Sequence, residues 1–352
     1  MQDSSKNILF LMSTANQAAS AAPVREPLNE LGYKAVAVGL EKYFSLPVKE
    51  KFQDKFDQFI VVENPTCIND LMWSLTPEQL RAQGKAFWSL FPEILESTKP
   101  VVLVTGNDRG YLEQMGVKRA SMRKIPTLLL QDGLLNDQSF PTEGQGLPGR
   151  TKLALQRLLG ALLPETYGWQ PYTDSPAIGY GLGATTIKAL SDPWSLEILK
   201  ARGIDAGRAI ITGQPRFDSM ATVSPEETEL IRSELSAALP QPELVLFATQ
   251  AIGAWGEVDP ELYDKTVRAI FVSLGQHSDY LGVVVRPHPS EDPDYYQNVI
   301  TELGISNALL YKKGALHPVI NACDSFLTGY STTALEAIIL GKPVLLVNPF
   351  GV

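Results

Sequence analysis

The sequence predicts an α/β protein with two doubly wound domains, each built on a parallel sheet with helices on both faces. Short apolar runs recur along the 352 residues, and segments with helical periodicity separate them. Continuous apolar runs of this length are typical of strands buried on both faces, as in parallel sheets. Small and polar residues follow several runs directly, at the position where open parallel sheets bind ligands.

Composition and charge exclude several other classes of protein. Hydrophobic residues make up 44% of the chain and charged residues 20%, as in ordinary globular proteins. The formal net charge is −9 and no basic cluster occurs, so no nucleic-acid partner is expected. Two cysteines, Cys67 and Cys323, lie far apart and indicate neither a disulfide framework nor a metal site, which favours a cytoplasmic protein.

In the first half of the chain, apolar runs predict five strands, and two further strands are expected near 184–190 and 208–212. A long helix is expected over 76–98, with Thr76 as N-cap and Pro77 as its first residue. Segment 137–180 is dense in Gly, Pro, Ser and Thr, which predicts long loops around an apolar helix at 153–163. That helix leaves open a peripheral contact with the inner face of a membrane, although no apolar run approaches the ~18 residues of a membrane span. The five runs are 7–12, 34–40, 59–62, 100–106 and 126–133.

A new cycle of strands and helices begins at the segment TGQPRFD, where Gly213 and Pro215 interrupt the pattern. The predicted domains are therefore residues 1–213 and 214–352. A domain of the second kind usually carries one more helix at its end, so the chain is expected to be truncated after Val352. The second domain should contain five strands, at 244–248, 281–286, 308–311, 326–327 and 343–347.

The segment TGYSTTALEA places small hydroxyl residues between the fourth of these strands and a helix. A glycine turn at Gly329 would let a ligand approach the backbone, and a helix start binds phosphate through its free N–H groups. The hydroxyls of Ser331 and Thr332 would add donors. Alternatively, Thr333 and Glu336 have the spacing of a capping box, which would explain Thr333 without a ligand. Glu336 could instead accept hydrogen bonds from ribose hydroxyls.

His288 stands between two prolines directly after a predicted strand, in the segment VVVRPHPSE. The prolines would hold the ring in place, and an imidazole there could donate to a phosphate oxygen and stabilise a leaving group. A loop histidine that only packs is the alternative. Arg286, at the strand end, is either a phosphate partner or part of a structural salt bridge.

Asp132 follows the predicted strand at 126–133 and precedes a glycine. It could act as a general base at a cleft between the domains, although Asp-Gly is also a common turn pair. The predicted hinge contains Gly213, Gln214 and Arg216. A structural role is the default for these residues, and contact with a ligand is the alternative. The first domain contains no Asp-x-Asp pair, so the sequence does not predict a bound divalent metal there.

These motifs together resemble those of the GT-B glycosyltransferases and their relatives. The motifs occur in the order QDG, GQPRFD, RPHP and GYSTTALEAIILGKP, and the likeness is concentrated in residues 212–348. The last motif is similar to the donor-binding segment of non-hydrolysing UDP-N-acetylglucosamine 2-epimerases and of CDP-glycerol glycerophosphotransferases. The acid-glycine, His-Pro and Ser/Thr motifs also resemble the trio of bacterial sialyltransferases and Kdo transferases, which use CMP-sugars.

The resemblance implies a fold of two Rossmann-like domains whose parallel sheets face a cleft, and a role for each matching residue. Asp132 would deprotonate the acceptor hydroxyl, His288 would contact the donor phosphate, and Ser331 and Thr332 would hold that phosphate. Glu336 would bind the ribose or the edge of the base. The sequence departs from the family at Gln131, where sialyltransferases often have a second acid, and at Thr332-Thr333, where the epimerases have two glycines.

The implied activity is that of a metal-independent inverting glycosyltransferase, which builds a bacterial surface polysaccharide such as a capsule or lipopolysaccharide. Its partners would be a CMP- or UDP-sugar donor and a glycan or lipid-linked acceptor, with no other cofactor. An epimerase or a CDP-glycerol-type glycerophosphotransferase on the same scaffold is the first alternative. A non-catalytic subunit that keeps the fold and only binds glycan is the second.

Overall fold

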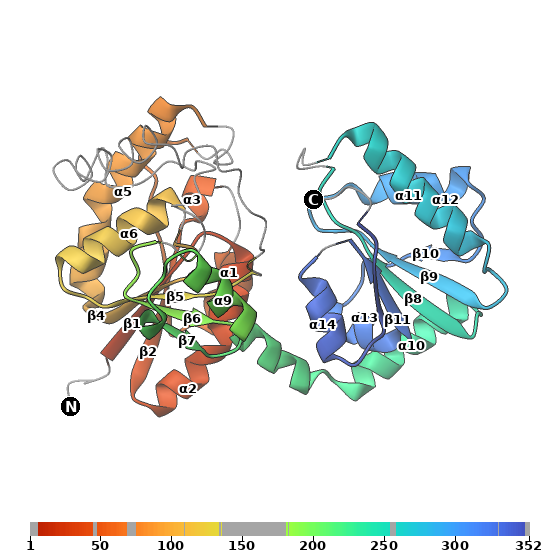
Figure 1. Ribbon diagram of the computed structural model, residues 1–352, viewed down its shortest axis with the longest axis horizontal. Helices are drawn as coiled ribbons and strands as arrows, with labels where there is room; N and C mark the ends of the chain where they lie inside the picture. Colours follow the sequence, from red (N-terminus) through yellow and green to blue (C-terminus); the bar gives the residue numbers. More distant parts are fainter. Residues whose placement is uncertain are drawn as a thin grey trace. The chain divides into compact units, whose positions relative to one another are not determined.

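The computed structural model describes residues 6–44, 48–68, 75–108, 110–133, 135, 181, 183–253, 258–329 and 331–348. The chain divides into two compact units, Met1–Arg216 and Phe217–Val352, which Figure 1 shows in red to green and in green to blue. The domain boundary expected from the sequence, between Gly213 and Gln214, stays a prediction. The expected loops at 137–180, with the apolar helix at 153–163, lie outside the described residues.

The first unit is built on a seven-stranded parallel sheet with the strand order β3-β2-β1-β4-β5-β6-β7. The order reverses between β1 and β4, which are direct neighbours in the sheet. Phe10 of β1 lies opposite Ala37 on one side and Val104 on the other, so the strand is enclosed within the sheet. The strands are β1 Lys6–Met12, β2 Tyr33–Gly39, β3 Gln58–Val61, β4 Pro100–Thr105, β5 Thr127–Leu130, β6 Ile187–Leu190 and β7 Ala209–Ile211.

Helices cover both faces of this sheet (Figure 1), because its strands bury apolar side chains on both faces. Leu9 and Leu11 of β1 pack with one group of helices, and Phe10 and Met12 pack with the other. The first group comprises α5 Pro77–Thr98, α6 Tyr111–Met122 and the short α3 Glu41–Phe44; the second comprises α1 Ala15–Ala21, α2 Arg25–Glu30 and α4 Lys49–Phe52. Helix α9, Pro193–Ala201, packs near β6 and β7.

The predicted start of helix α5 is confirmed. Thr76 is the N-cap, its side chain accepts a hydrogen bond from the backbone N–H of Gln79 at 3.3 Å, and Gln79 accepts one from the backbone N–H of Thr76 at 2.8 Å. Such a reciprocal capping box satisfies two N–H groups that would otherwise lack partners. Phe87 and Phe91 of this helix stack at 4.9 Å in the core.

The second unit is built on a five-stranded parallel sheet with the order β10-β9-β8-β11-β12, and the order reverses between β8 and β11. Figure 1 shows α11 and α12 on one side of the sheet and α10, α13 and α14 on the other. The strands are β8 Glu243–Ala248, β9 Leu281–Arg286, β10 Ala308–Leu310, β11 Ser325–Thr328 and β12 Val344–Leu346. The helices are α10 Pro225–Ala238, α11 Pro260–Gly275, α12 Pro293–Glu302, α13 Leu316–Ala322 and α14 Thr333–Ile339.

Three helices of the second unit begin in the same way. Ser224, Asp259 and Asp292 each accept a hydrogen bond from a backbone N–H in the first turn, and a proline follows each of them. Proline suits this position because its missing N–H would have no partner inside the helix. The two parallel sheets confirm the predicted α/β class. In the described ranges, no helix is long and apolar enough to cross a membrane.

Candidate functional site

The loops that follow β8, β9 and β11 lie at the carboxyl edge of the second unit's sheet. Because β8 lies between β9 and β11, its loop separates the loop of His288 from that of Gly329. The backbone N–H of His288 donates to Oγ1 of Thr249 at 3.1 Å. On the other side, a side chain at Gly329 would collide with Oε1 of Gln250. Thr249 and Gln250 therefore join the two predicted segments, and our reading of the sequence missed both.

His288 is half-buried, and its ring is held in one orientation by its own loop. Nδ1 accepts a hydrogen bond from the backbone N–H of Ser290 at 3.1 Å, which places the proton of the neutral ring on Nε2. Burial lowers the pKa of His288, and the charge of nearby Glu291 opposes this effect. The ring is therefore suited to donate a hydrogen bond from Nε2 to an anionic oxygen.

The segment after β11 adopts a different arrangement from the predicted capping box. Helix α14 begins at Thr333, and Ser331 Oγ accepts hydrogen bonds from the backbone N–H of Thr333 at 3.3 Å and from its hydroxyl at 2.9 Å. Glu336 is buried and lies 3.2 Å from Nε2 of His317, at the start of α13. The capping box between Thr333 and Glu336 is thus wrong, because Glu336 has another partner. Thr332 is the N-cap, and its side chain makes no capping hydrogen bond.

Arg286 ends β9 and holds the loop that follows β10. Its guanidinium donates to the backbone carbonyls of Lys313 at 2.5 Å and of Gly314 at 2.7 Å. Burial lowers the pKa of this group, which still carries its charge at neutral pH. These bonds show a structural role for Arg286, and its contact with a phosphate stays a prediction.

In the first unit, Asp132 follows β5 and is half-buried. The preceding Gln131 is almost fully buried and ties this loop to the start of α9. Its Nε2 donates to Ser195 Oγ at 3.0 Å and to the carbonyl of Gly133 at 2.7 Å, and its Oε1 accepts from the backbone N–H of Ser191 at 3.0 Å. Gln131 thus uses both the donor and the acceptor of its amide, and a carboxylate could not donate these two bonds.

A buried carboxyl group that the sequence did not single out lies close to Asp132. Glu113 of α6 has only 1% of its surface exposed, and Oε1 accepts a hydrogen bond from the Ser13 hydroxyl at 2.5 Å. Burial raises the pKa of Glu113, and the negative charge of Asp132 raises it further. Among the atoms of the described residues, none pairs with Oε2 of Glu113. Ser13 follows β1 and Glu113 follows β4, so this cluster lies at the strand-order reversal of the first sheet.

The predicted hinge residues attach to the first unit. Gln214 is buried, and its Nε2 donates to the backbone carbonyl of Gln131 at 3.2 Å. Its Oε1 accepts from Nε of Arg216 at 3.1 Å. Gly213 has φ +76°, a conformation that favours glycine, so this residue is required by the turn. Ligand contact by these residues stays a prediction.

The predicted site residues therefore form two groups. The second unit brings together His288 and the Gly329–Thr333 segment through the β8 loop, whereas Asp132 belongs to the first unit. Within the ranges that the structure describes, no group of three or more His, Cys, Asp or Glu side chains could hold a metal ion.

Several solved structures have the same fold as this chain. A UDP-N-acetylglucosamine 2-epimerase matches with a TM-score of 0.62 and 15% identity over 98% of this chain and 79% of its own. The chain has the fold of these epimerases. The epimerase of Neisseria meningitidis bound to UDP-GlcNAc matches with a TM-score of 0.61 and 18% identity, over 97% of this chain and 83% of its own. The Anabaena protein HepE, in complex with UDP and glucose, matches with a TM-score of 0.55 and 14% identity, over 97% and 80%. No family model matches the sequence, and no curated protein matches it significantly.

Proposed function

We propose that the protein is an inverting glycosyltransferase that uses a nucleotide-activated sugar, with UDP-sugars as the first donors to test. The main support is the His288 ring, whose neutral form carries its proton on Nε2 and which the β8 loop joins to the Gly329 segment. Similar structures contain UDP or UDP-GlcNAc, which favours a uridine nucleotide among the two donor classes that the motifs imply.

In the proposed reaction, the bond between C1 of the sugar and the donor phosphate breaks, and the nucleotide leaves with its electron pair. The acceptor hydroxyl bonds to C1 from the opposite face, so the configuration inverts. Asp132 takes the proton of that hydroxyl. His288 and the hydroxyls of Ser331 and Thr332 stabilise the charge that develops on the departing phosphate. This chemistry needs no metal, because protein donors supply the stabilisation.

The test has a binding arm and a turnover arm. Calorimetric titration with UDP, CDP, CMP, GDP and ADP should show one preferred nucleotide, with unchanged affinity in EDTA. Sugar donors of that nucleotide are then incubated with glycan and lipid-linked acceptors, and the anomeric product is identified by NMR. No binding of any nucleotide would overturn the proposal and would favour the non-catalytic glycan-binding subunit.

An epimerase is the second candidate, because the similar solved structures include UDP-N-acetylglucosamine 2-epimerases. It would use the same departure of the nucleotide but needs no acceptor. UDP-GlcNAc is incubated alone and followed by NMR for its C2 epimer, whose appearance would replace the transferase proposal. A strict requirement for CDP-glycerol would identify a glycerophosphotransferase instead. For a transferase of this kind we propose a cytoplasmic location, at the inner face of the membrane where its acceptor is lipid-linked.

A further inference from the structure

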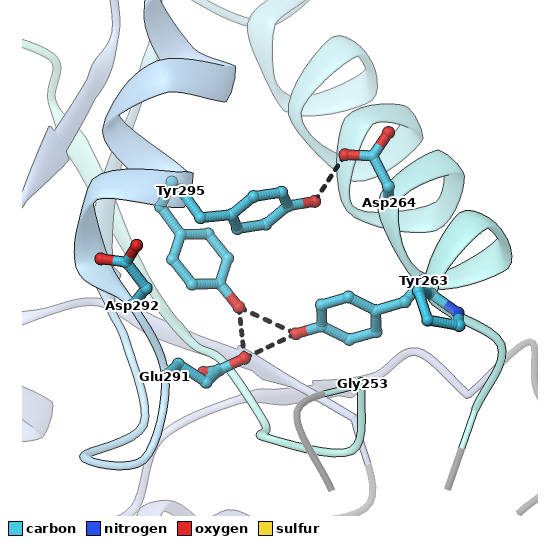
Figure 2. Close-up of a pocket in the computed structure, with 8 residues that line it drawn as sticks. Gly253, Tyr263, Asp264, Glu291, Asp292 and Tyr295 are labelled. Carbon is cyan, nitrogen blue, oxygen red and sulfur yellow. Dashed lines mark hydrogen bonds between the residues drawn. The ribbon is translucent and has the colours of Figure 1, made fainter. Parts of the chain in front are cut away.

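A network of hydroxyl groups surrounds the carboxylate of Glu291, in the same loop as His288. Figure 2 shows Glu291 below Tyr295, with its carboxylate directed at the hydroxyl of Tyr263. Tyr263 comes from α11 and Tyr296 from α12, so the network joins two helices to the loop between β9 and α12. These residues line a cavity of about 250 Å³ together with Gly253 and Asp264.

The carboxylate of Glu291 accepts hydrogen bonds on both oxygens. Oε1 accepts from the Tyr263 hydroxyl at 2.8 Å and from the Tyr296 hydroxyl at 2.6 Å. Oε2 accepts from the backbone N–H of His288 at 2.9 Å and from the Thr249 hydroxyl. Burial raises the pKa of both tyrosines, and the charge of Glu291 adds to this, so both phenols remain donors.

This arrangement fixes two loops relative to each other. The backbone N–H of Glu291 donates to the carbonyl of His288 at 2.9 Å. The backbone of His288 therefore both donates a hydrogen bond to Glu291 and accepts one from it. The Thr249 hydroxyl, which donates to Glu291, belongs to the β8 loop, and the side chain of the next residue, Gln250, packs against Gly329. Glu291 therefore connects the His288 loop, which carries a proposed phosphate contact, with the β8 loop, which packs against Gly329 of the other proposed segment.

We propose that Glu291 is a positioning residue, which holds the backbone of His288, directly and through Thr249, so that the imidazole faces the donor phosphate. This inference rests on the proposed function of the second unit. It adds a residue that touches no reacting atom and acts through His288.

Substitutions can test this role of Glu291: a conservative one, one that removes the carboxylate, and a pair of tyrosine variants of which one is a matched control. In Glu291→Gln, the amide oxygen can keep the bonds to His288 and Thr249, while the NH₂ group faces tyrosine hydroxyls that can turn to accept. Glu291→Ala removes all four bonds. Tyr296→Phe removes one donor to Glu291, whereas Tyr295→Phe removes a hydroxyl in the same cavity that donates to Asp264 instead.

The first measurement is the affinity for the preferred nucleotide diphosphate by calorimetry. Glu291→Ala should weaken it by roughly tenfold, as expected for a lost charge-assisted hydrogen bond, and Gln should restore it to within about threefold of wild type. Tyr296→Phe should weaken it more than Tyr295→Phe. In a His288→Ala background, Glu291→Ala should have little further effect, because its action passes through His288. An equal loss in both backgrounds would show a merely structural role and overturn the inference.

The second measurement needs no ligand. The protein has only three histidines, so the ring nitrogens of His288 can be assigned by ¹⁵N NMR. Wild type should show the tautomer with the proton on Nε2, and Glu291→Ala should shift toward a mixture of tautomers. An unchanged His288 spectrum would overturn the inference even where nucleotides bind. A changed spectrum in a protein that binds no nucleotide would support the positioning role and refute the proposed function alone.

Discussion

Replacing Glu113 with Gln should stabilise the first unit relative to wild type, and this advantage should grow with pH. The carboxyl group is 1% exposed, the Ser13 hydroxyl bonds only Oε1, and none of the described residues pairs with Oε2. Burial, with the charge of Asp132 in addition, raises the pKa of Glu113 above its ordinary value of about 4.5. The folded protein therefore keeps this proton at a pH where the unfolded chain has lost it.

The sign and size follow from proton linkage. Above pH 4.5 the folded state binds more protons at this site than the unfolded state, so the free energy of unfolding falls as pH rises. The slope reaches at most about 1.4 kcal/mol per pH unit and vanishes above the raised pKa of the folded state. Gln has the shape of the protonated acid, can accept from Ser13 and has no proton to lose. The stability difference between variant and wild type should therefore increase by up to about 1.4 kcal/mol per pH unit.

Urea unfolding at several pH values between 5 and 8 tests this, with tryptophan fluorescence as the probe. Trp88 is buried in the core of the first unit and reports on its unfolding. Glu93→Gln on α5 is the matched control, since that side chain lies in water in both states and should give a constant difference. A constant difference for Glu113→Gln as well would mean that Glu113 is already ionised in the folded protein. The buried-acid interpretation would then be wrong.

Three further variants test the two groups of site residues and the fold of the first unit. His288→Ala should lower kcat by about 10²–10³ with an unchanged Tm, because it removes a donor to the departing phosphate. Near-normal turnover would mean that His288 has no part in catalysis. Asp132→Asn should abolish transfer and leave nucleotide affinity in calorimetry unchanged, whereas lost affinity would indicate a structural role. Lys188→Met should reduce the free energy of unfolding by about 3–5 kcal/mol, because it leaves buried Asp108 without its cation at 3.9 Å. A loss below about 1 kcal/mol in urea titration at pH 7 would show that the two backbone N–H groups that donate to the Asp108 carboxylate, at 2.9 and 2.8 Å, are enough to stabilise it.

The sequence predicted the fold class because a strand that is buried on both faces leaves a continuous apolar run. The run LGVVVR became β9, and the side chains of Val283, Val284 and Val285 are fully buried. Helix starts were equally local: Thr76 caps α5 through residues within one turn of it. Such features depend on residues that are close in the sequence, so they can be predicted from one sequence.

The contacts of the site could not be predicted in this way, because they depend on the order of strands in the sheet. Nothing in the sequence states that β8 lies between β9 and β11, which is why Thr249 and Gln250 were missed. Glu336 has a partner 19 residues away, His317, and this long-range pair replaced the local capping box. The position of Glu113 near Asp132 depends in the same way on β4 and β5 being neighbours.

Both sheets reverse their strand order at the point where these polar residues gather. In the first unit Ser13 follows β1 and Glu113 lies on the helix after β4; in the second, Thr249 follows β8 and Gly329 follows β11. At such a reversal, successive connections leave toward opposite faces of the sheet and open a crevice for a ligand. Since the proposed nucleotide contacts all come from the second unit, nucleotide affinity should depend on that unit alone. Turnover should depend on both units, because the proposed base, Asp132, belongs to the first.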